Sequence, residues 1–255
     1  MQPYGSVLIT GASSGIGQAL ALAIASPGVT LHLSGRDRPR LNTVARACEA
    51  RGAAVEPAQL DVRDANAMAA WIETAGRLHL VIANAGISAG TGEGTPESAS
   101  QVRAIFDTNL GGVLNTVLPA MAVMADQPPD EAGVRGRIAA IASVAAFIAA
   151  PGAPAYCASK AAVDAWIVGS APTARTRGIG LTSVCPGYVR TPMTADNRFP
   201  MPGLMQAERA ARITLRGIAA GRTRVVFPWW MGLGARVADA LPPRLVAALG
   251  PKVGK

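Results

Sequence analysis

Ser143, Tyr156 and Lys160 carry the side chains whose types and spacing best suit the movement of a proton. Tyr156 and Lys160 stand four residues apart in a predicted helix and therefore project from the same helical face. A tyrosine with a pKa of about 10 is a poor base at neutral pH, but a neighbouring ammonium group favours the phenolate and lowers that pKa. Ser143 precedes Tyr156 by 13 residues and follows a predicted strand. A tyrosine and a lysine at this spacing also occur on ordinary amphipathic surface helices, so other elements must supply a site around them.

A glycine-rich turn follows the first apolar run of the chain. Residues 10–17 read Thr-Gly-Ala-Ser-Ser-Gly-Ile-Gly and join a predicted strand to a predicted helix. Glycines let a pyrophosphate approach the helix N-terminus, where free N–H groups and the helix dipole stabilise negative charge. A helix-capping loop can look similar, but the position in the first strand–helix joint favours a dinucleotide site. The predicted contacts are Gly11, Ser13, Ser14, Gly15, Ile16 and Gly17.

The end of the second predicted strand indicates which dinucleotide is bound. An NAD site usually places a carboxylate there for the ribose hydroxyls, whereas this chain has Ser34-Gly35-Arg36. Arg36 could bind a 2′-phosphate through charge-assisted hydrogen bonds, and a carboxylate would repel it. We therefore expect NADP(H) in preference to NAD(H). Asp37 comes one position late and could instead cap the following helix. Additional phosphate contacts are expected from Ser13, Ser34 and Arg38.

Short β-branched runs alternate with alanine-rich helical stretches along the whole chain. The predicted strands are Val7–Thr10, Val29–Ser34, a third that ends at Leu60–Val62, Leu78–Ala83, Arg137–Ala142, Gly180–Cys185 and Thr223–Pro228. The predicted helices end at Ala25, span Arg38–Arg51, Ala65–Ala75 and Pro96–Ala125, and begin again at Ala155. This alternation predicts the α/β class, with a single doubly wound Rossmann-type domain over residues 1–255 and a central parallel sheet of about seven strands.

Taken in order, these motifs resemble the classical short-chain dehydrogenase/reductase family over nearly the whole chain. Further pieces of the resemblance are Asn84-Ala85-Gly86 after the fourth strand, Asn109 in the long helix, Pro186-Gly187, and Val189-Arg190-Thr191. Ala83 stands where the family commonly has an asparagine before the Asn-Ala-Gly motif. The resemblance implies an oxidoreductase that interconverts a hydroxyl and a carbonyl.

The resemblance also implies a role for each matching residue. Tyr156 would exchange the proton, Ser143 would hydrogen-bond the substrate oxygen, and Lys160 would lower the Tyr156 pKa and hold the nicotinamide ribose. Asn109 would support a water that links Lys160 to solvent. The implied contacts to the cofactor are Asp61 and Val62 at the adenine, Asn84, Ala85 and Gly86 along the cleft, and Pro186, Gly187, Val189 and Thr191 at the nicotinamide, besides Tyr156 and Lys160. Hydride passes directly between nicotinamide C4 and the substrate carbon, so no metal is called for.

Residues 190–206 occupy the position of the family's variable substrate lid. Met193, Phe199 and Met205 in this segment suit an adaptable pocket for a hydrophobic ketone or secondary alcohol, although a loop that packs its own apolar residues would look the same. A 3-oxoacyl-thioester reductase is an alternative. A catalytically idle dinucleotide-binding scaffold is a weaker one, because binding alone needs no proton relay.

Composition narrows the partners and the compartment. The net charge of +8 comes mostly from scattered arginines, without the basic runs or interleaved aromatics of a nucleic-acid site, so no nucleic acid is expected. Three cysteines without metal-ligand or disulfide spacing favour a reducing compartment, and no leader or long apolar span is apparent. We therefore expect a cytoplasmic protein with a small carbonyl or alcohol substrate.

Two features depart from an ordinary member of the family. Pro172 falls inside the helix after Lys160 and should kink or end it, which puts the family's usual tetramer in question, so a dimer or a tetramer is expected. The C-terminal tail, residues 229–255, begins with Trp229-Trp230 and combines apolar spacing with basic residues. It could contact a membrane peripherally, but packing within the protein or its oligomer is favoured.

Overall fold

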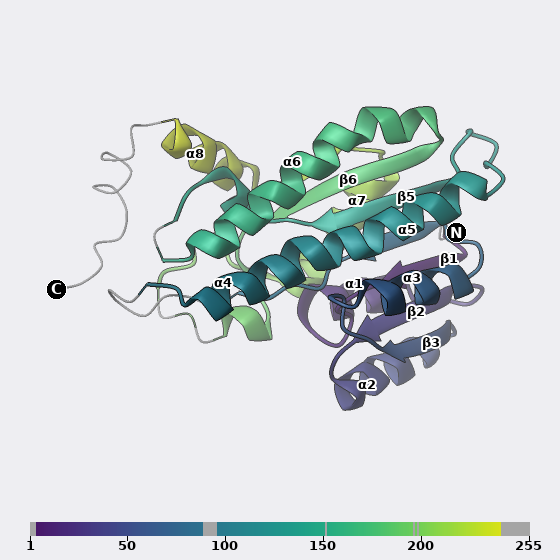
Figure 1. Cartoon of the computed structure of the whole chain (residues 1–255). Coiled ribbons are helices and arrows are strands. Elements are labelled where there is room, and N and C mark those ends of the chain that lie inside the picture. Colours follow the sequence, from purple (N-terminus) through teal and green to yellow (C-terminus); the bar gives the residue numbers. More distant parts are fainter. Residues whose placement is uncertain (1–3, 89–95, 151, 196, 198, 241–255) are drawn as a thin grey trace.

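A parallel sheet of seven strands forms the centre of the computed structural model (Figure 1). The structure describes residues 4–88, 96–150, 152–195, 197 and 199–240. The strands are β1 (Ser6–Ile9), β2 (Thr30–Gly35), β3 (Ala54–Gln59), β4 (Leu80–Ala83), β5 (Gly136–Ile141), β6 (Ile179–Pro186) and β9 (Arg224–Phe227). Their order in the sheet is β3-β2-β1-β4-β5-β6-β9, so the chain reverses direction across the sheet between β1 and β4. The carboxyl ends of these two strands are where such sheets bind ligands.

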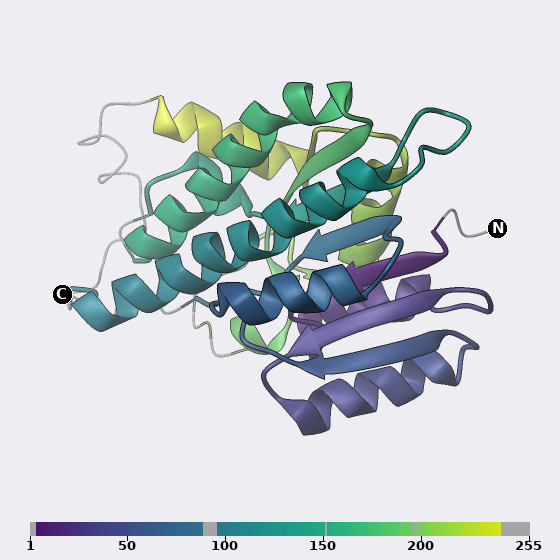
Figure 2. The same cartoon turned by 45° about the vertical axis from the view of Figure 1, so that its right-hand side comes forward.

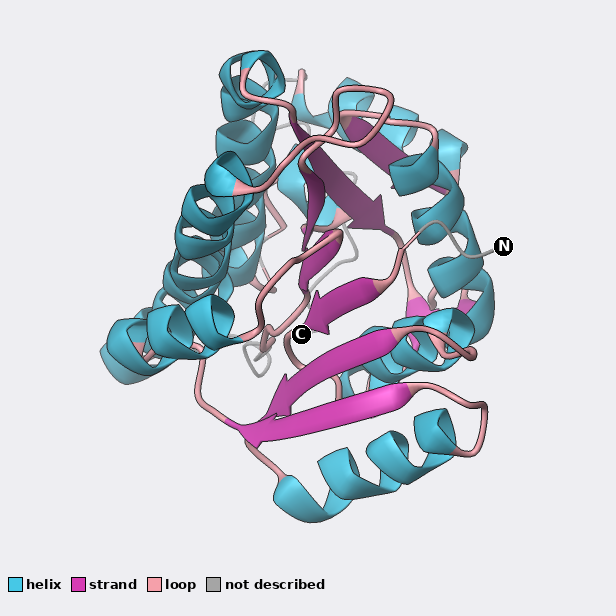
Figure 3. Cartoon of the chain, turned by 90° about the vertical axis from the view of Figure 1, so that its right-hand side faces the viewer, coloured by secondary structure: helices cyan, strands magenta, loops and turns pink. Residues whose placement is uncertain are grey.

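Helices cover both faces of the sheet, as Figure 3 shows end-on. One face carries α1 (Gly15–Ile24), α2 (Arg38–Glu49) and α7 (Ala207–Ala219); the other carries α3 (Ala65–Thr74), α5 (Gly112–Asp126) and α6 (Pro154–Thr176). Alternate strand residues face opposite layers: Val7 and Ile9 join the first core, whereas Leu8 joins the second. The predicted doubly wound α/β fold with about seven parallel strands is confirmed.

The long helix predicted over Pro96–Ala125 is interrupted by a π-helical turn. α4 (Ala99–Phe106) leads into this turn at Asp107–Gly111, and α5 continues to Asp126. A π turn inserts one extra residue and rotates the side chains around it, often at functional sites. Here it contains Asn109, which is fully buried. The hydrophobic pattern of the sequence did not reveal this turn.

By length and composition, the continuous helix Ala99–Asp126 could cross a bilayer. A core helix passes the same test. In this fold Val113, Val117 and Met124 are buried in the second core, against α3 and the sheet. We therefore regard it as a core helix.

Pro172 was expected to kink or end its helix, and it does not end it, because α6 continues to Thr176. Pro172 lies one turn from the end of α6 and is exposed, so the missing N–H removes only one hydrogen bond near the end of the helix. α5 also contains a proline, Pro119, in the middle of the helix.

The lid and the tail lie at the carboxyl end of the sheet. β7 (Val189–Arg190) and β8 (Met205–Gln206) pair in a small parallel sheet at the two ends of the lid. α8 (Trp229–Asp239) follows β9 directly (Figure 2). Residues 196 and 198 of the predicted lid, and 241–255 of the predicted tail, lie outside the described residues.

Candidate active site

The glycine-rich turn between β1 and α1 is packed too closely to accept side chains. Gly11 has a φ of +64°, and a Cβ there would meet Ala85 Cα at 2.7 Å. A Cβ on Gly17 would meet the Gly11 carbonyl oxygen at 2.3 Å. Ser14 is the N-cap of α1, and its side chain makes no capping hydrogen bond. The first N–H groups of α1 are therefore available to an anion.

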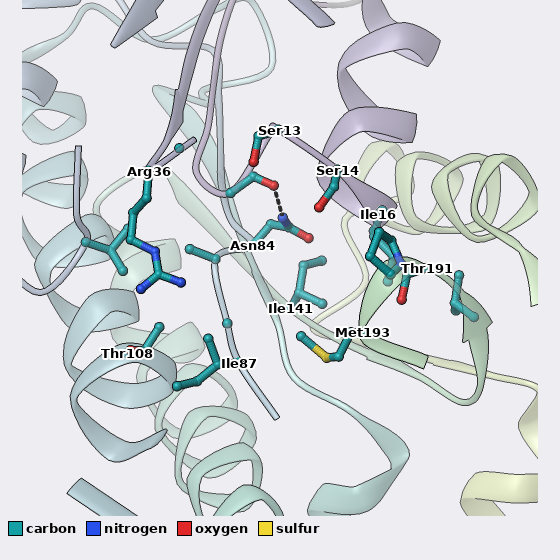
Figure 4. A pocket seen from close by; sticks show the side chains of 18 of the residues that line it. Ser13, Ser14, Ile16, Arg36, Asn84, Ile87, Thr108, Ile141, Thr191 and Met193 are labelled. Carbon is teal, nitrogen blue, oxygen red and sulfur yellow. Dashed lines mark hydrogen bonds between the residues drawn. The ribbon is translucent and has the colours of Figure 1, made fainter. Parts of the chain in front are cut away.

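Asn84 holds this turn in place from the end of β4. Its Nδ2 donates to the carbonyl oxygens of Thr10 and Gly11, both at 3.0 Å, and Figure 4 shows this contact. Its backbone N–H donates to Thr10 Oγ1 at 3.0 Å, and so does that of Ala85 at 3.2 Å. The Asn-Ala-Gly segment thus positions the turn as well as lining the cleft. Sequence reasoning missed Thr10.

A cleft of about 660 Å³ runs from this turn across the carboxyl ends of the strands. It brings together the predicted site residues with three exceptions, Gly17, Arg38 and Asn109, which do not line it. The lining residues that sequence reasoning did not assign to the site include Arg40, Leu60, Ile87, Thr108, Ile141 and Thr194. Met193 of the predicted lid also lines the cleft, as expected. Leu60, Ile87 and Thr108 are each one residue from a predicted site residue.

Arg36, Asp37 and Arg40 lie at the end of β2. The Asp37 carboxylate caps α2 by accepting from the Arg40 N–H at 2.9 Å and pairs with Arg40 Nε at 2.6 Å. The capping alternative for Asp37 is therefore confirmed. These hydrogen bonds hold the pKa of Asp37 below its usual value. Arg38 does not line the cleft, whereas Arg40, whose Nε donates to the Asp37 carboxylate, does.

The Arg36 side chain extends from β2 into the cleft (Figure 4). Its positive charge helps to lower the pKa of the Asp61 carboxyl, after the larger contribution of hydrogen bonds from Arg63. Because Asp61 already has Arg63 as a bidentate partner, the Arg36 guanidinium remains available to another anion.

Ser143 follows β5 and is fixed by the turn that it begins. Its Oγ accepts from the Ala145 N–H at 3.1 Å and caps the 3₁₀ turn Val144–Phe147. The hydroxyl also lies 3.5 Å from the Pro186 carbonyl oxygen at the end of β6. The side chain is buried and contacts Tyr156 by a hydrogen bond.

Tyr156 and Lys160 project from the first turns of α6 into the cleft, as the spacing predicted. Lys160 Nζ lies 5.9 Å from the centroid of the Tyr156 ring and donates to the Ile141 carbonyl oxygen at 2.7 Å. Glu97 meets the start of this helix by accepting from the Ala155 N–H at 3.0 Å.

The expected lowering of the Tyr156 pKa by Lys160 is wrong in this structure. Burial raises the pKa of the Tyr156 hydroxyl above its usual value of 10.0, and the hydrogen bond with Ser143 only opposes this. The Lys160 ammonium is directed at a backbone carbonyl rather than at the phenol oxygen. Burial also lowers the pKa of Lys160 to about 8, with Cys185 acting in the opposite direction.

Asn109 lies behind Tyr156 and Lys160 and connects the segment that contains Ile87 to α6. Its Oδ1 accepts from the Ile87 N–H at 2.8 Å, and its Nδ2 donates to the Ile87 carbonyl at 2.9 Å. Nδ2 also donates to Ser159 Oγ on α6 at 3.1 Å. The π turn therefore fastens the Asn-Ala-Gly segment to the helix that carries Tyr156.

The family model for short chain dehydrogenases matches residues 6–201, more than half of the chain. The chain belongs to the short-chain dehydrogenase family. An uncharacterized oxidoreductase of Myxococcus xanthus (strain DK1622) is 36% identical over 249 residues, which cover 96% of each chain. This short-chain dehydrogenase is accordingly an NAD(P)-dependent oxidoreductase.

Solved structures of short-chain dehydrogenases share the architecture. A Sphingobium yanoikuyae enzyme in complex with NADPH has a TM-score of 0.78 at 27% identity, over 93% of this chain and 96% of that one. A Burkholderia phymatum enzyme in complex with NAD has a TM-score of 0.81 at 25% identity, over 93% and 94%. The 3-oxoacyl-[acyl-carrier protein] reductase of Brucella melitensis has a TM-score of 0.74 at 26% identity, over 87% and 89%. Relatives of similar likeness thus bind either dinucleotide.

The residues of this short-chain dehydrogenase fit a dinucleotide. The close packing at Gly11 and Gly17 leaves bare backbone and free N–H groups for a pyrophosphate. Ser34 Oγ is buried beside the cleft and, among the described residues, finds no hydrogen-bond partner in the protein. A buried hydroxyl of this kind is costly unless something bonds to it, and a ligand in the cleft can do so.

Proposed function

We propose that this enzyme reduces hydrophobic ketones with NADPH, and catalyses the reverse oxidation of secondary alcohols, with Tyr156 as the proton donor or acceptor. The observation that carries the proposal is the convergence of Ser143, Tyr156 and Lys160 at one end of the dinucleotide cleft. A binding scaffold would need no hydroxyl pair of this kind beside a buried lysine, so the idle-scaffold alternative has no support from the site.

The chain's own residues would handle the proton. When bound in the cleft, NADPH would supply the hydride that the carbonyl carbon accepts. Tyr156 donates its hydroxyl proton to the carbonyl oxygen, which Ser143 orients by a hydrogen bond. Lys160 would hold the nicotinamide ribose and return a proton to Tyr156. Asn109 positions α6 against the Asn-Ala-Gly segment; that it also supports a water next to Lys160 stays a prediction.

The raised pKa of Tyr156 favours reduction as the direction near neutral pH. A phenol whose pKa is above 10.0 remains protonated at pH 7 and can act as the acid that carbonyl reduction needs. Oxidation of an alcohol needs the phenolate, which burial disfavours. We therefore expect the oxidation rate to rise with pH more steeply than the reduction rate.

Replacement of Tyr156 by phenylalanine tests the chemistry. Tyr156→Phe removes the transferable proton and keeps the ring, so kcat/KM for NADPH-dependent ketone reduction should fall by more than about 100-fold. The Kd for NADPH, measured by fluorescence titration, should stay within about threefold. A variant that keeps a tenth or more of the native kcat/KM would show that Tyr156 is not the proton donor.

The choice of NADP(H) rests on the charges at the end of β2. Arg36 and Arg40 both line the cleft there, and Asp37 is occupied by capping α2. Arg36→Asp should therefore weaken NADPH far more than NADH, by about 10- to 100-fold in the ratio of the two Kd values. Arg38→Asp is the matched control, since Arg38 lies outside the cleft lining. Equal affinity of the native enzyme for NADH and NADPH would refute the preference.

The substrate class is inferred from the lid. Met193 lines the cleft, and Phe199 packs edge-on against Tyr188 with ring centroids 5.9 Å apart. These apolar and polarizable groups suit a hydrophobic ketone. The Brucella melitensis relative keeps the 3-oxoacyl-thioester alternative open. A panel of ketones and 3-oxoacyl thioesters, followed by the fall of NADPH absorbance, would separate the two.

The proposed setting is the cytoplasm, with the enzyme as a homo-oligomer. Cys48, Cys157 and Cys185 are all free and buried, as suits a reducing compartment.

A further inference from the structure

The turn that Ser143 begins is anchored by one aromatic ring. Of its four residues, Val144–Phe147, Phe147 is buried and the other three are partly exposed. Ser143 Oγ accepts from the Ala145 N–H inside this turn at 3.1 Å. Because the turn is short and its own backbone holds the serine, a shift of the Phe147 ring moves the Ser143 hydroxyl with it.

Two guanidinium groups approach the Phe147 ring. Arg224 of β9 lies 5.6 Å from the ring centroid, and Arg236 of α8 lies 4.3 Å from it. A cation within about 6 Å of an aromatic centroid is attracted to the ring. Gly232 of α8 packs beside them, since an added Cβ there would lie 3.8 Å from the ring and 2.4 Å from Val226 Cγ1 of β9. The turn is therefore held against β9 and α8 together.

α8 supports the site with its inner side only. Besides the contact of Arg236, the Met231 sulfur lies against Gly187, where an added Cβ would be 2.7 Å from it. On the outer side of the helix Trp229 is 72% exposed and Val237 is 58% exposed. The expected burial of the tail within the chain is wrong for these two side chains.

Arg224 is itself fixed by a buried carboxylate on α6. Its Nε donates to Asp164 Oδ1 at 2.9 Å and its Nη2 donates to Oδ2 at 2.6 Å. Asp164 is 5% exposed, and its Oδ1 also accepts from Ser183 Oγ at 2.7 Å and from Cys185 Sγ at 3.4 Å, both on β6. A buried ion pair is weak evidence for net stability, and its best attested use is to fix how the elements that carry it are placed.

Asp164 also belongs to the helix that carries the catalytic tyrosine. It follows Lys160 by four residues and Tyr156 by eight, so all three lie on one helical face of α6. β6, whose residues donate to Asp164, ends at Pro186, and the Pro186 carbonyl oxygen lies 3.5 Å from Ser143 Oγ. One carboxylate thus links the helix of Tyr156 to both elements that hold Ser143, namely β6 directly and the Ser143 turn through Arg224.

We propose that the Asp164–Arg224 pair acts through the Phe147 ring as a positioning device that aligns the Ser143 hydroxyl with the Tyr156 hydroxyl. Asp164, Arg224 and Phe147 are not among the described residues that line the cleft, so they act on the reaction through Ser143 rather than on the substrate. The inference rests on the proposed function, which assigns the substrate oxygen to Ser143 and Tyr156.

A double-mutant cycle between Phe147 and Ser143 tests this proposal. Phe147→Leu removes the ring and keeps an apolar side chain, so kcat for NADPH-dependent ketone reduction should fall by about tenfold while the Kd for NADPH stays within about twofold. Ser143→Ala alone should lower kcat by about 100-fold. Adding Phe147→Leu to Ser143→Ala should then lower kcat by less than about twofold further, because the hydroxyl that the ring positions is already gone. A merely structural role of the ring would give the same loss in both backgrounds.

Arg224→Gln tests the same link from β9. It removes the bidentate pairing and the cation beside the ring at a position that is partly exposed, so kcat should fall by about fivefold in the native background and by less than about twofold in Ser143→Ala. It replaces Phe147→Leu in the cycle if thermal unfolding shows that Phe147→Leu does not fold. Arg137→Gln is the matched control, because Arg137 is a partly exposed arginine at the amino end of β5, far from the carboxyl ends that form the cleft. The control should keep kcat within about twofold of the native value.

Two outcomes would overturn the positioning role. Either the folded Phe147→Leu or Arg224→Gln variant keeps kcat within about twofold of the native value, or its loss multiplies with that of Ser143→Ala. In both cases the low kcat of Ser143→Ala itself would leave the proposed function standing. A Ser143→Ala variant with native kcat would instead refute the role of Ser143 in the proposed function, and the positioning role with it.

Discussion

Replacement of Gly17 by alanine tests how closely the glycine-rich turn, α1 and Asn84 must fit. The added Cβ would lie 2.3 Å from the Gly11 carbonyl oxygen and 2.5 Å from Asn84 Nδ2. The Gly11 carbonyl group and Asn84 Nδ2 restrict each other's movement, because Asn84 Nδ2 donates to the carbonyl oxygens of Thr10 and Gly11. A tolerable contact requires the turn to move by roughly 1 Å, and overpacking of this kind costs about 1–3 kcal/mol.

That cost can appear in two quantities. If the turn stays in place, the free energy of unfolding falls by about 1–3 kcal/mol. If the turn moves, the N–H groups that face a pyrophosphate move with it, and the Kd for NADPH rises by roughly 5- to 150-fold for the same free energy. Thermal unfolding without nucleotide and fluorescence titration with NADPH measure the two parts separately.

Gly169→Ala is the matched control for Gly17→Ala. Gly169 is an exposed residue inside α6, and a Cβ there would meet nothing within 4 Å. Alanine in an open helical position should stabilise by about 0.5–1 kcal/mol and leave NADPH binding unchanged. A Gly17→Ala variant with native stability and a Kd within twofold of the native value would refute the close fit.

Two further predictions concern buried charges. Burial lowers the pKa of Lys160 to about 8, so the folded state binds the Lys160 proton more weakly than the unfolded state does. The stability of the native protein, followed as Tm against pH, should therefore rise between about pH 8 and 10. Lys160→Met should lack that rise. Asp164 is buried on α6 and pairs with Arg224 Nε at 2.9 Å and Nη2 at 2.6 Å. Asp164→Asn should lower the free energy of unfolding by about 2–3 kcal/mol, less than for a fully buried pair because Arg224 is partly exposed. Burial alone would raise the Asp164 pKa, but hydrogen bonds from Arg224 and Ser183 hold it below its usual value. This stabilisation is therefore present at neutral pH and should disappear in the native protein, but not in Asp164→Asn, as pH falls below about 4 in urea titrations.

The sequence located the residues whose position is decided locally. Gly11 and Ser14 lie in a turn between two adjacent elements, and Tyr156 and Lys160 share a helical face, so short-range geometry suffices for each. The alternation of strands and helices likewise predicted a parallel sheet with helices on both faces. Ser143 could be placed at the mouth of the cleft because the carboxyl ends of parallel strands meet at one edge.

What the sequence did not show depends on contacts between distant elements. Arg40 lines the cleft in place of the expected Arg38, and its side chain pairs with the Asp37 carboxylate there. The π turn places the Asn109 side-chain amide where it hydrogen-bonds to both Ile87 and Ser159. These two residues are 22 and 50 residues away from Asn109 along the chain. The exposure of Trp229 follows from the packing of Gly232 on β9, which no helical periodicity could specify.

Burial at the catalytic end changes the order in which Tyr156 and Lys160 would release protons. In water a tyrosine and a lysine have similar pKa values, near 10. In this site burial disfavours both charged forms: it raises the pKa of the Tyr156 hydroxyl and lowers that of the Lys160 ammonium to about 8. Lys160 thereby becomes the stronger acid of the two, and a proton passes downhill from its ammonium group to a Tyr156 phenolate. If Tyr156 gives its proton to a ketone, Lys160 is suited to replace it. The departure from the expected pKa shift at Tyr156 therefore supports reduction, with the lysine as the source that returns the hydroxyl to its protonated form.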